Sequence, residues 1–75
     1  MFETLKKFLV EQVNVNADDV TMEAELSGDL GINSLELAEL VYTCEDEFNI
    51  EIADEDLHNF VTVGDVVRYL EEKAK

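Results

Sequence analysis

Ser34 is the residue of this chain best placed to carry chemistry. It lies in the run DLGINSL, residues 29–35, and directly precedes an acidic segment with helical spacing of its apolar residues. The unpaired N–H groups and the positive dipole end at the start of a helix favour negative charge there. A serine hydroxyl at this position is therefore well placed to carry an anionic group. The alternative is an ordinary helix N-cap, in which the hydroxyl accepts a hydrogen bond from one backbone N–H.

The other residues of reactive type do not form a catalytic set. Ser34 is not part of a GxSxG elbow, and the only histidine, His58, has no partners for a triad. The single cysteine, Cys44, falls on the apolar side of a helical pattern, so we expect a buried, unreactive thiol and no internal disulfide. We expect His58 at the surface. The sequence therefore predicts neither a hydrolase nor a thiol enzyme.

Acidic residues that could bind a cation occur in two places. One set has the spacing of calcium-loop ligands: Asn14, Asn16, Asp18 and Glu25. Asp19 stands where the sharp turn of such a loop requires glycine, so a calcium loop is not expected. The second set, Asp54, Glu55 and Asp56, would bind divalent cations loosely and relieve repulsion. No dedicated metal site is predicted.

Helices are needed to position these residues, and the spacing of apolar residues predicts four of them and no strand. The first covers about residues 2–14. The second begins at Asn33 or Ser34, either of which can cap it, and Asn33 with Glu36 has the spacing of a capping box. A short helical turn follows over about 54–60, and Thr62 caps the last helix with Asp65 at its third position. The apolar stripe of the second helix comprises Leu37, Leu40, Val41, Cys44 and Phe48.

The connection between the first two helices, residues 14–33, is long for so small a chain, which usually means function or local order. Gly28 and Gly31 permit tight turns in it. We expect six of its apolar residues to contact the core: Val15, Val20, Met22, Leu26, Leu30 and Ile32. The predicted fold is all-α, a small four-helix bundle forming one domain over residues 1–75.

Charge limits the partners of this domain. The chain holds 19 acidic and 5 basic residues, a formal net charge of −14, and no Lys or Arg occurs between Phe8 and Val67. Such a surface repels nucleic acid and anionic lipid and steers basic proteins toward it. A merely solubilising surface is the alternative. No apolar run is long enough to span a bilayer and the start lacks the pattern of a secretory signal, so the expected location is the cytoplasm.

The run DLGINSLELAELVYTCEDEFNIEIADEDLHNFVTVGDVVRYLEE resembles the acyl carrier proteins of fatty-acid and polyketide synthesis. With the first helix, the resemblance covers nearly the whole chain. Members of that family carry an Asp-Ser-Leu signature whose serine is esterified by 4′-phosphopantetheine, and acyl chains are bound to this arm as thioesters. The resemblance implies that Ser34 is this serine. It further implies a monomeric, non-enzymatic carrier of three longer helices and one short helix.

The resemblance also implies two sets of binding residues. The second helix would be the docking face for a phosphopantetheinyl transferase and for basic acyl-transferring or acyl-modifying enzymes, with Ala38 an additional apolar contact. The docking residues would be Leu35, Glu36, Glu39, Tyr42, Glu45, Asp46, Glu47, Asp54 and Glu55. The acyl pocket would be lined by Leu40, Val41, Cys44, Phe48, Ile52, Leu57 and Val63.

The chain departs from the family signature at one position, since Asn33 replaces the aspartate before the serine. Asparagine can still cap a helix but cannot form a salt bridge. In the family this acid is thought to help the transferase dock, so we interpret the chain as a divergent or specialised carrier. The alternatives are a carrier of aminoacyl or other unusual acids and an unmodified acidic module that binds a basic protein or mimics nucleic acid.

Overall fold

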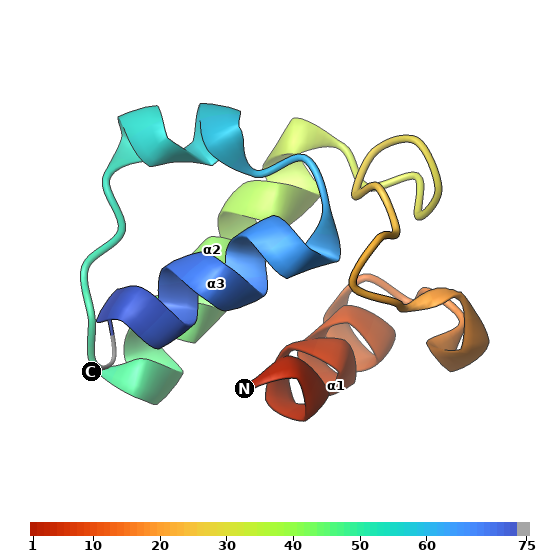
Figure 1. Ribbon diagram of the computed structural model, residues 1–75, viewed down its shortest axis with the longest axis horizontal. Helices are drawn as coiled ribbons and strands as arrows, with labels where there is room; N and C mark the ends of the chain where they lie inside the picture. The colour runs from red at the N-terminus through yellow and green to blue at the C-terminus, as the bar shows by residue number, and fades with distance from the viewer. Residues whose placement is uncertain (74–75) are drawn as a thin grey trace.

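The computed structural model describes residues 1–73 and is helical (Figure 1). Its elements are α1 (Phe2–Gln12), the 3-10 turn η1 (Ala17–Asp19), α2 (Ser34–Phe48), the 3-10 turn η2 (Asp54–Asn59) and α3 (Val63–Lys73). Residues 1–73 contain no strand, only an isolated antiparallel bridge between Glu25 and Thr62. The predicted three longer helices and one short helix are confirmed. The last two residues of the predicted domain, Ala74 and Lys75, lie outside the described residues.

The three α-helices bury their apolar stripes against one another, with α1 in contact with both α2 and α3. Leu5 and Leu9 of α1 and Leu70 of α3 are completely buried. Full burial of a leucine side chain stabilises a fold by roughly 1.5–3 kcal/mol. On α2 the predicted stripe is confirmed: its middle is buried, and Leu37 and Phe48 nearer the helix ends are half-buried against the core.

The connection between α1 and α2 is ordered by apolar anchors. Five of the six predicted residues contact the core: Val20, Leu26 and Ile32 are buried, and Val15 and Leu30 are half-buried. The prediction for Met22 is wrong, since its side chain is 37% exposed. Its backbone is the anchor instead, because the carbonyl oxygen of Met22 accepts a hydrogen bond from Gly64 N at 2.8 Å. Ala24, two residues further along the chain, is buried although the sequence did not single it out.

Backbone hydrogen bonds join this connection to the start of α3. Leu26 N donates to Val61 O at 2.8 Å, and Val63 N donates to Ala24 O at 2.9 Å. A Cβ atom on Gly64 would lie 2.9 Å from Met22 O, closer than real Cβ atoms approach, so the absence of a side chain allows this contact. Gly31 has a φ of +67°, which glycine adopts readily. The residues before α2 are thus fixed to the rest of the bundle.

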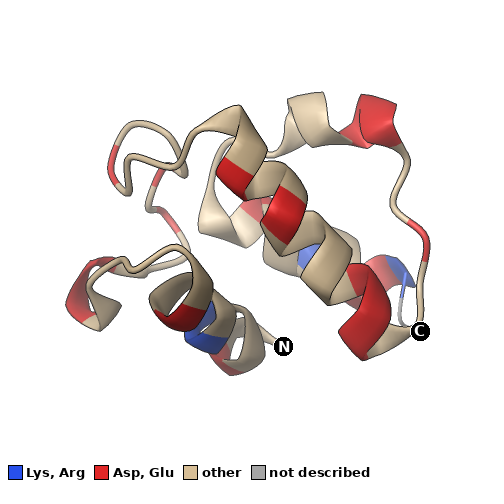
Figure 2. Cartoon of the chain, turned by 180° about the vertical axis from the view of Figure 1, so that it is seen from behind, with Lys and Arg blue, Asp and Glu red and all other residues tan. Residues whose placement is uncertain are grey.

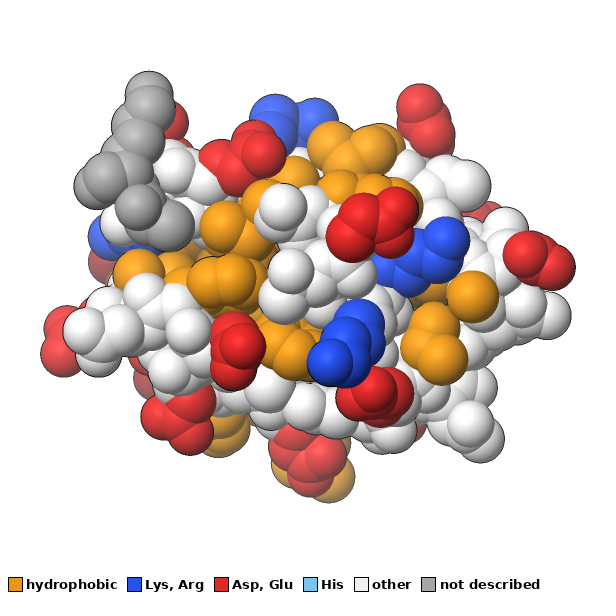
Figure 3. Space-filling view, turned by 90° about the horizontal axis from the view of Figure 1, so that it is seen from below, with side chains coloured by type: hydrophobic (Ala, Val, Ile, Leu, Met, Phe, Trp, Pro, Cys, Tyr) orange, Lys and Arg blue, Asp and Glu red, His pale blue; other side chains and the backbone are white. Residues whose placement is uncertain are grey.

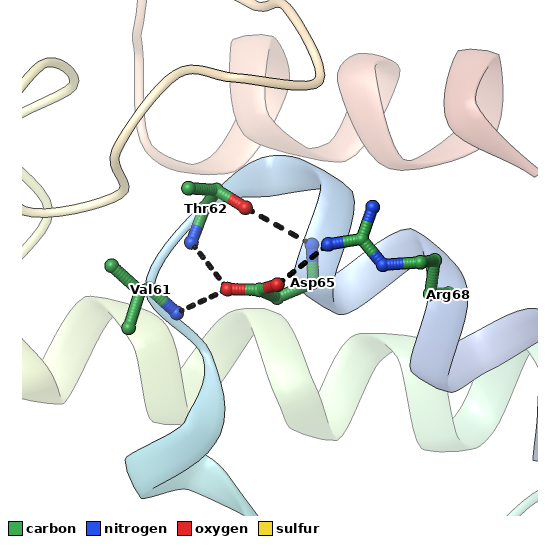
Figure 4. Close-up of polar contacts among 4 residues, drawn as sticks. All are labelled: Val61, Thr62, Asp65 and Arg68. Atoms are coloured by element: carbon green, nitrogen blue, oxygen red, sulfur yellow. Dashed lines mark hydrogen bonds and ion pairs between the residues drawn. The ribbon is translucent and has the colours of Figure 1, made fainter.

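Thr62 and Asp65 cap the start of α3, as predicted (Figure 4). Thr62 Oγ1 accepts a hydrogen bond from Asp65 N at 3.2 Å, and Asp65 Oδ2 accepts from Thr62 N at 3.0 Å and from Val61 N at 3.2 Å. Arg68 Nη2 lies 2.7 Å from the other carboxylate oxygen. The N–H of Thr62 contributes most to lowering the pKa of Asp65, and the contacts with Val61 and Arg68 act in the same direction.

This geometry predicts an acid-dependent loss of stability. Because the pKa of Asp65 is lower in the folded chain than its ordinary value of 3.8, its charged form stabilises the fold above that value. The contribution is lost as the pH falls through the lowered pKa. Denaturant unfolding from about pH 6 to about pH 2.5 should therefore show a shallower acid decline in Asp65→Asn than in the wild type. Glu72→Gln, on an exposed residue of the same helix, serves as control. Identical acid declines for wild type and Asp65→Asn would contradict this assignment.

Candidate attachment site at the start of α2

Asn33, not Ser34, caps α2. Asn33 Oδ1 accepts a hydrogen bond from Glu36 N at 2.8 Å, and Glu36 Oε1 accepts from Asn33 N at 3.1 Å, which completes the predicted capping box. Ser34 is then the first residue of the helix, and it is exposed. Among residues 1–73 its hydroxyl has no hydrogen-bond partner. The N-cap interpretation of Ser34 is therefore wrong, and the hydroxyl is available for chemistry.

The residues before Ser34 hold it in place. Asp29 Oδ2 accepts a hydrogen bond from Glu25 N at 2.8 Å, while Glu25 O accepts from the N–H groups of Asp29 and Leu30, both at 3.0 Å. Ile32 is buried and donates its N–H to Leu26 O at 2.9 Å. The aspartate of the DLG run therefore closes the loop that leads into α2. Sequence reasoning missed this role. The available signal is the residue type, because aspartate side chains often accept hydrogen bonds from backbone N–H groups a few residues away.

The exposed face of α2 combines acids with two large apolar side chains. Leu35 is 70% exposed and Tyr42 is 63% exposed. Glu39 and Asp46 are also exposed, and the steps of four, three and four residues from Leu35 to Asp46 place all four on one stripe of the helix. We call these four residues the α2 stripe. Figure 2 shows acidic residues at several points along α2, where no Lys or Arg is present.

Two of the predicted docking acids already have hydrogen-bond partners within the chain. Glu36 completes the capping box, and the half-buried Glu45 accepts a hydrogen bond from Ile52 N at 2.9 Å. Three further predicted docking residues are exposed: Glu47, Asp54 and Glu55. Figure 3 shows the face on the α1 side, where Lys and Arg side chains lie among the acids. On α2, by contrast, no Lys or Arg lies among the acids.

The residues predicted to line an acyl pocket lie together in the core. Five of them are buried: Leu40, Val41, Cys44, Ile52 and Val63. Phe48 and Leu57 are half-buried against the same cluster, and the Phe48 ring lies 6.4 Å from that of Phe8 on α1. Burial, with a smaller effect of Glu45, raises the pKa of the Cys44 thiol to about 12. That thiol is therefore protonated and unreactive, as predicted.

The remaining residues considered for chemistry are separate from Ser34. His58 is exposed in η2, as predicted. Asn16 caps η1 by accepting a hydrogen bond from Asp18 N at 3.0 Å, and Asp56 accepts one from a tyrosine of α3. Residues 1–73 bring together no group of three or more His, Cys, Asp or Glu side chains that could hold a metal ion. No helix in the same range is long and apolar enough to cross a bilayer.

Comparison with known families decides the class of this chain. The family described as "Phosphopantetheine attachment site" matches residues 3–70. The chain is 49% identical over 71 residues to the acyl carrier protein of Wolinella succinogenes, which covers 95% of this chain and 93% of that protein. The chain belongs to the acyl carrier protein family. It is also 46% identical over 75 residues to the acyl carrier protein of Clostridium perfringens, covering 100% of this chain and 99% of that protein.

The fold agrees with this assignment. The crystal structure of an acyl carrier protein from Thermotoga maritima matches with a TM-score of 0.84 at 25% identity, covering 95% of this chain and 82% of that chain. Acyl carrier proteins are carriers and not enzymes, and the family holds a covalently attached 4′-phosphopantetheine. An exposed hydroxyl without a hydrogen-bond partner at a helix start fits a phosphate ester, because helix starts favour anions. Family membership also implies contact with a phosphopantetheinyl transferase and with acyl-handling enzymes.

Proposed function

We propose that Ser34 is the residue to which 4′-phosphopantetheine is attached, and that the chain carries acyl groups as thioesters in fatty-acid or related lipid or polyketide synthesis. The observation that carries this proposal is the exposed Ser34 hydroxyl, left without a partner because Asn33 caps the helix. In the loading reaction the Ser34 oxygen forms a bond to the phosphorus of coenzyme A that bears the pantetheine group. The Ser34 hydroxyl loses its proton, the diphosphate P–O bond breaks, and adenosine 3′,5′-bisphosphate leaves.

The start of α2 suits the charge of the resulting phosphodiester. The first N–H groups of a helix have no partner within the helix. In α2, Glu36 N is bonded to Asn33 Oδ1 and Leu37 N to Asn33 O at 2.9 Å. The N–H groups of Ser34 and Leu35 have no partner within residues 1–73, so they remain available to the phosphate. A thiol at the far end of the arm supplies the site for acyl attachment.

The site can be tested by loading the purified chain. Incubation with coenzyme A and a broad-specificity phosphopantetheinyl transferase should add the mass of one phosphopantetheine group, measured on the intact protein. A chain that stays unmodified with several transferases, while a control carrier is loaded in the same mixtures, would overturn the proposal and favour an unmodified acidic binding module. A cytoplasmic location is also part of this proposal.

Asn33→Asp should be loaded faster than the wild type. Aspartate caps helices about as well as asparagine, so the capping geometry is retained, and the added negative charge lies beside Ser34. The gain should appear in the association rate with a basic transferase and shrink as salt rises, since screening weakens steering. Loading kinetics at low and high salt measure both effects. Equal rates at low salt would show that the charge at this position does not assist docking.

We propose that partners bind the α2 stripe. Reversing both of its charges in Glu39→Lys/Asp46→Lys should slow association with a basic partner enzyme by about tenfold or more at low salt, because local charge steers encounter. These two acids are chosen because Glu36 and Glu45 have structural hydrogen bonds. Stability should change by less than about 0.5 kcal/mol per exposed site.

A matched variant distinguishes the effect of charge on α2 from the effect of the net charge of the whole protein. Glu11→Lys/Glu72→Lys changes the net charge equally but on exposed residues of α1 and α3. Stopped-flow association against salt, with thermal unfolding of each variant, makes the comparison. If the α2 variant associates as fast as the α1/α3 variant while folded, the α2 stripe is an ordinary solvated surface and the docking proposal is wrong.

A further inference from the structure

The chain segment between α2 and α3, residues 49–60, contains no α-helix. We call it the crossing segment; Figure 1 shows it running beside the α2–α3 pair and containing η2. η2 is a six-residue 3-10 turn whose N-cap, Ala53, provides no side-chain hydrogen bond. Within η2, Asp56 and Leu57 are half-buried and the other residues are exposed. Ile52 and Phe60 anchor the two ends of this stretch in the core, but between them only Leu57 is an apolar residue that is even half-buried, so η2 depends on individual contacts to stay closed.

The shortest of these contacts comes from α3. Tyr69 Oη donates a hydrogen bond to Asp56 Oδ2 at 2.6 Å. Burial, followed by the contact with Asp56, raises the pKa of Tyr69, so the hydroxyl keeps its proton. The Tyr69 ring packs edge-on against the Phe60 ring at 5.1 Å, and Lys73 Nζ lies 5.6 Å from its centroid. Hydrogen bonds to a carboxylate are stronger than neutral ones, so this contact is the strongest polar link between η2 and α3.

The crossing segment also forms one wall of the proposed acyl pocket. Ile52 is 8% exposed and packs in the core, and Leu57 packs against it. The opposite walls come from Leu40 and Cys44 of α2 and from Val63 of α3. These atoms are closely packed, so an acyl chain can enter only if part of the surrounding wall moves. The crossing segment is the most exposed wall, because Ile52 is 8% exposed and Leu57 half-buried, whereas the residues of the opposite walls are at most 1% exposed.

We propose that the Tyr69–Asp56 hydrogen bond is a latch that holds the crossing segment closed and sets how readily an acyl chain enters and leaves the core. This inference rests on the proposed function of Ser34 and its acyl pocket. Tyr69 acts here as a positioning residue, since it contacts the wall and not the arm. Glu45, which accepts a hydrogen bond from Ile52 N at 2.9 Å, holds the beginning of the same segment.

Tyr69→Phe tests the latch because it removes the hydroxyl and keeps the ring that packs on Phe60. Asp56→Ala removes the acceptor from the other side, whereas Asp56→Asn keeps an oxygen acceptor without its charge and should restore the wild-type behaviour in part. Glu51→Ala, on an exposed acid of the crossing segment, is the matched control. The first readout is hydrogen exchange of the unloaded protein at the N–H groups of Ile52, Asp56 and Phe60, which donate hydrogen bonds within the described structure.

Exchange at these three N–H groups should become about tenfold faster in Tyr69→Phe and Asp56→Ala, the factor expected for loss of a hydrogen bond to a charged group. Glu51→Ala should exchange nearly as the wild type does, and Asp56→Asn should lie between the wild type and Asp56→Ala. The second readout uses the loaded protein carrying an octanoyl thioester. Attack on that thioester by hydroxylamine, measured by intact mass, should accelerate by a similar factor in the same two variants, because both processes require the segment to open.

The two readouts separate this inference from the proposed function. Exchange in Tyr69→Phe that equals the Glu51→Ala control overturns the latch. Faster exchange with unchanged thioester attack shows that the segment opens without affecting the acyl chain, and this too overturns the inference. If no phosphopantetheine attaches to the wild type, the proposed function fails and the inferred control of acyl entry fails with it. The exchange result would still show whether the hydrogen bond closes the segment.

Discussion

We expect Ser34→Ala to abolish loading with phosphopantetheine and to leave the helical fold unchanged. The hydroxyl oxygen is the atom that would bond to phosphorus, so no slower route remains once it is removed. The fold is retained because the cap of α2 is made by Asn33 and Glu36, and the Ser34 hydroxyl has no hydrogen bond in the described structure. Alanine is also a good helix former, so stability should stay within about 0.5 kcal/mol. Intact-mass analysis and thermal unfolding measure the two effects.

The chain provides a matched control for this variant. Ser27 is the only other serine, and it is exposed in the loop that precedes α2. Ser27→Ala should be loaded like the wild type. Residual loading of Ser34→Ala, or loss of loading in Ser27→Ala with the fold intact, would contradict the assignment of the site.

Leu40→Ala should destabilise the fold by about 2–5 kcal/mol and create space that an acyl chain can refill. Leu40 is only 1% exposed, in the middle of α2. A domain of this length has a total stability of about 4–11 kcal/mol, so the loss is a large part of it. The cavity would be apolar, and such cavities stay dry and bind apolar ligands. An octanoyl chain on the arm should therefore raise the unfolding temperature of Leu40→Ala more than that of the wild type.

Leu5→Ala is the comparison for this effect. Leu5 is completely buried but belongs to α1, outside the predicted pocket. Both variants should lose comparable stability, and only Leu40→Ala should regain it on acylation. Thermal unfolding of each loaded variant, with and without the octanoyl group, makes the test. Equal recovery in the two variants, or recovery in neither, would show that the acyl chain does not occupy the Leu40 side of the core.

The helices and their caps could be predicted from the sequence because their determinants are local. The steps of three and four residues that place Leu37, Leu40 and Cys44 on one face identify α2 without any tertiary information. The caps at Asn33 and Thr62 follow from side chains that reach N–H groups within three residues. Ser34 was predicted as the attachment residue from the family signature around it.

Contacts between distant parts of the chain could not be predicted in this way. The burial of Met22 was wrongly expected because apolar character alone does not show whether a loop is anchored by a side chain or by its backbone. The pairing of Tyr69 with Asp56 spans 13 residues and depends on how η2 lies against α3. Likewise, the hydrogen bond that engages Glu45 depends on the path of the chain after α2.

The central claim is that acyl groups are carried as thioesters on an arm attached to Ser34. Fragmentation mass spectrometry of the chain loaded with an octanoyl-bearing arm tests it most directly. The account predicts that the arm maps to Ser34 and that neutral hydroxylamine removes the octanoyl group while the arm stays on the protein. An arm located on any other residue, or an octanoyl group that resists hydroxylamine, would contradict it.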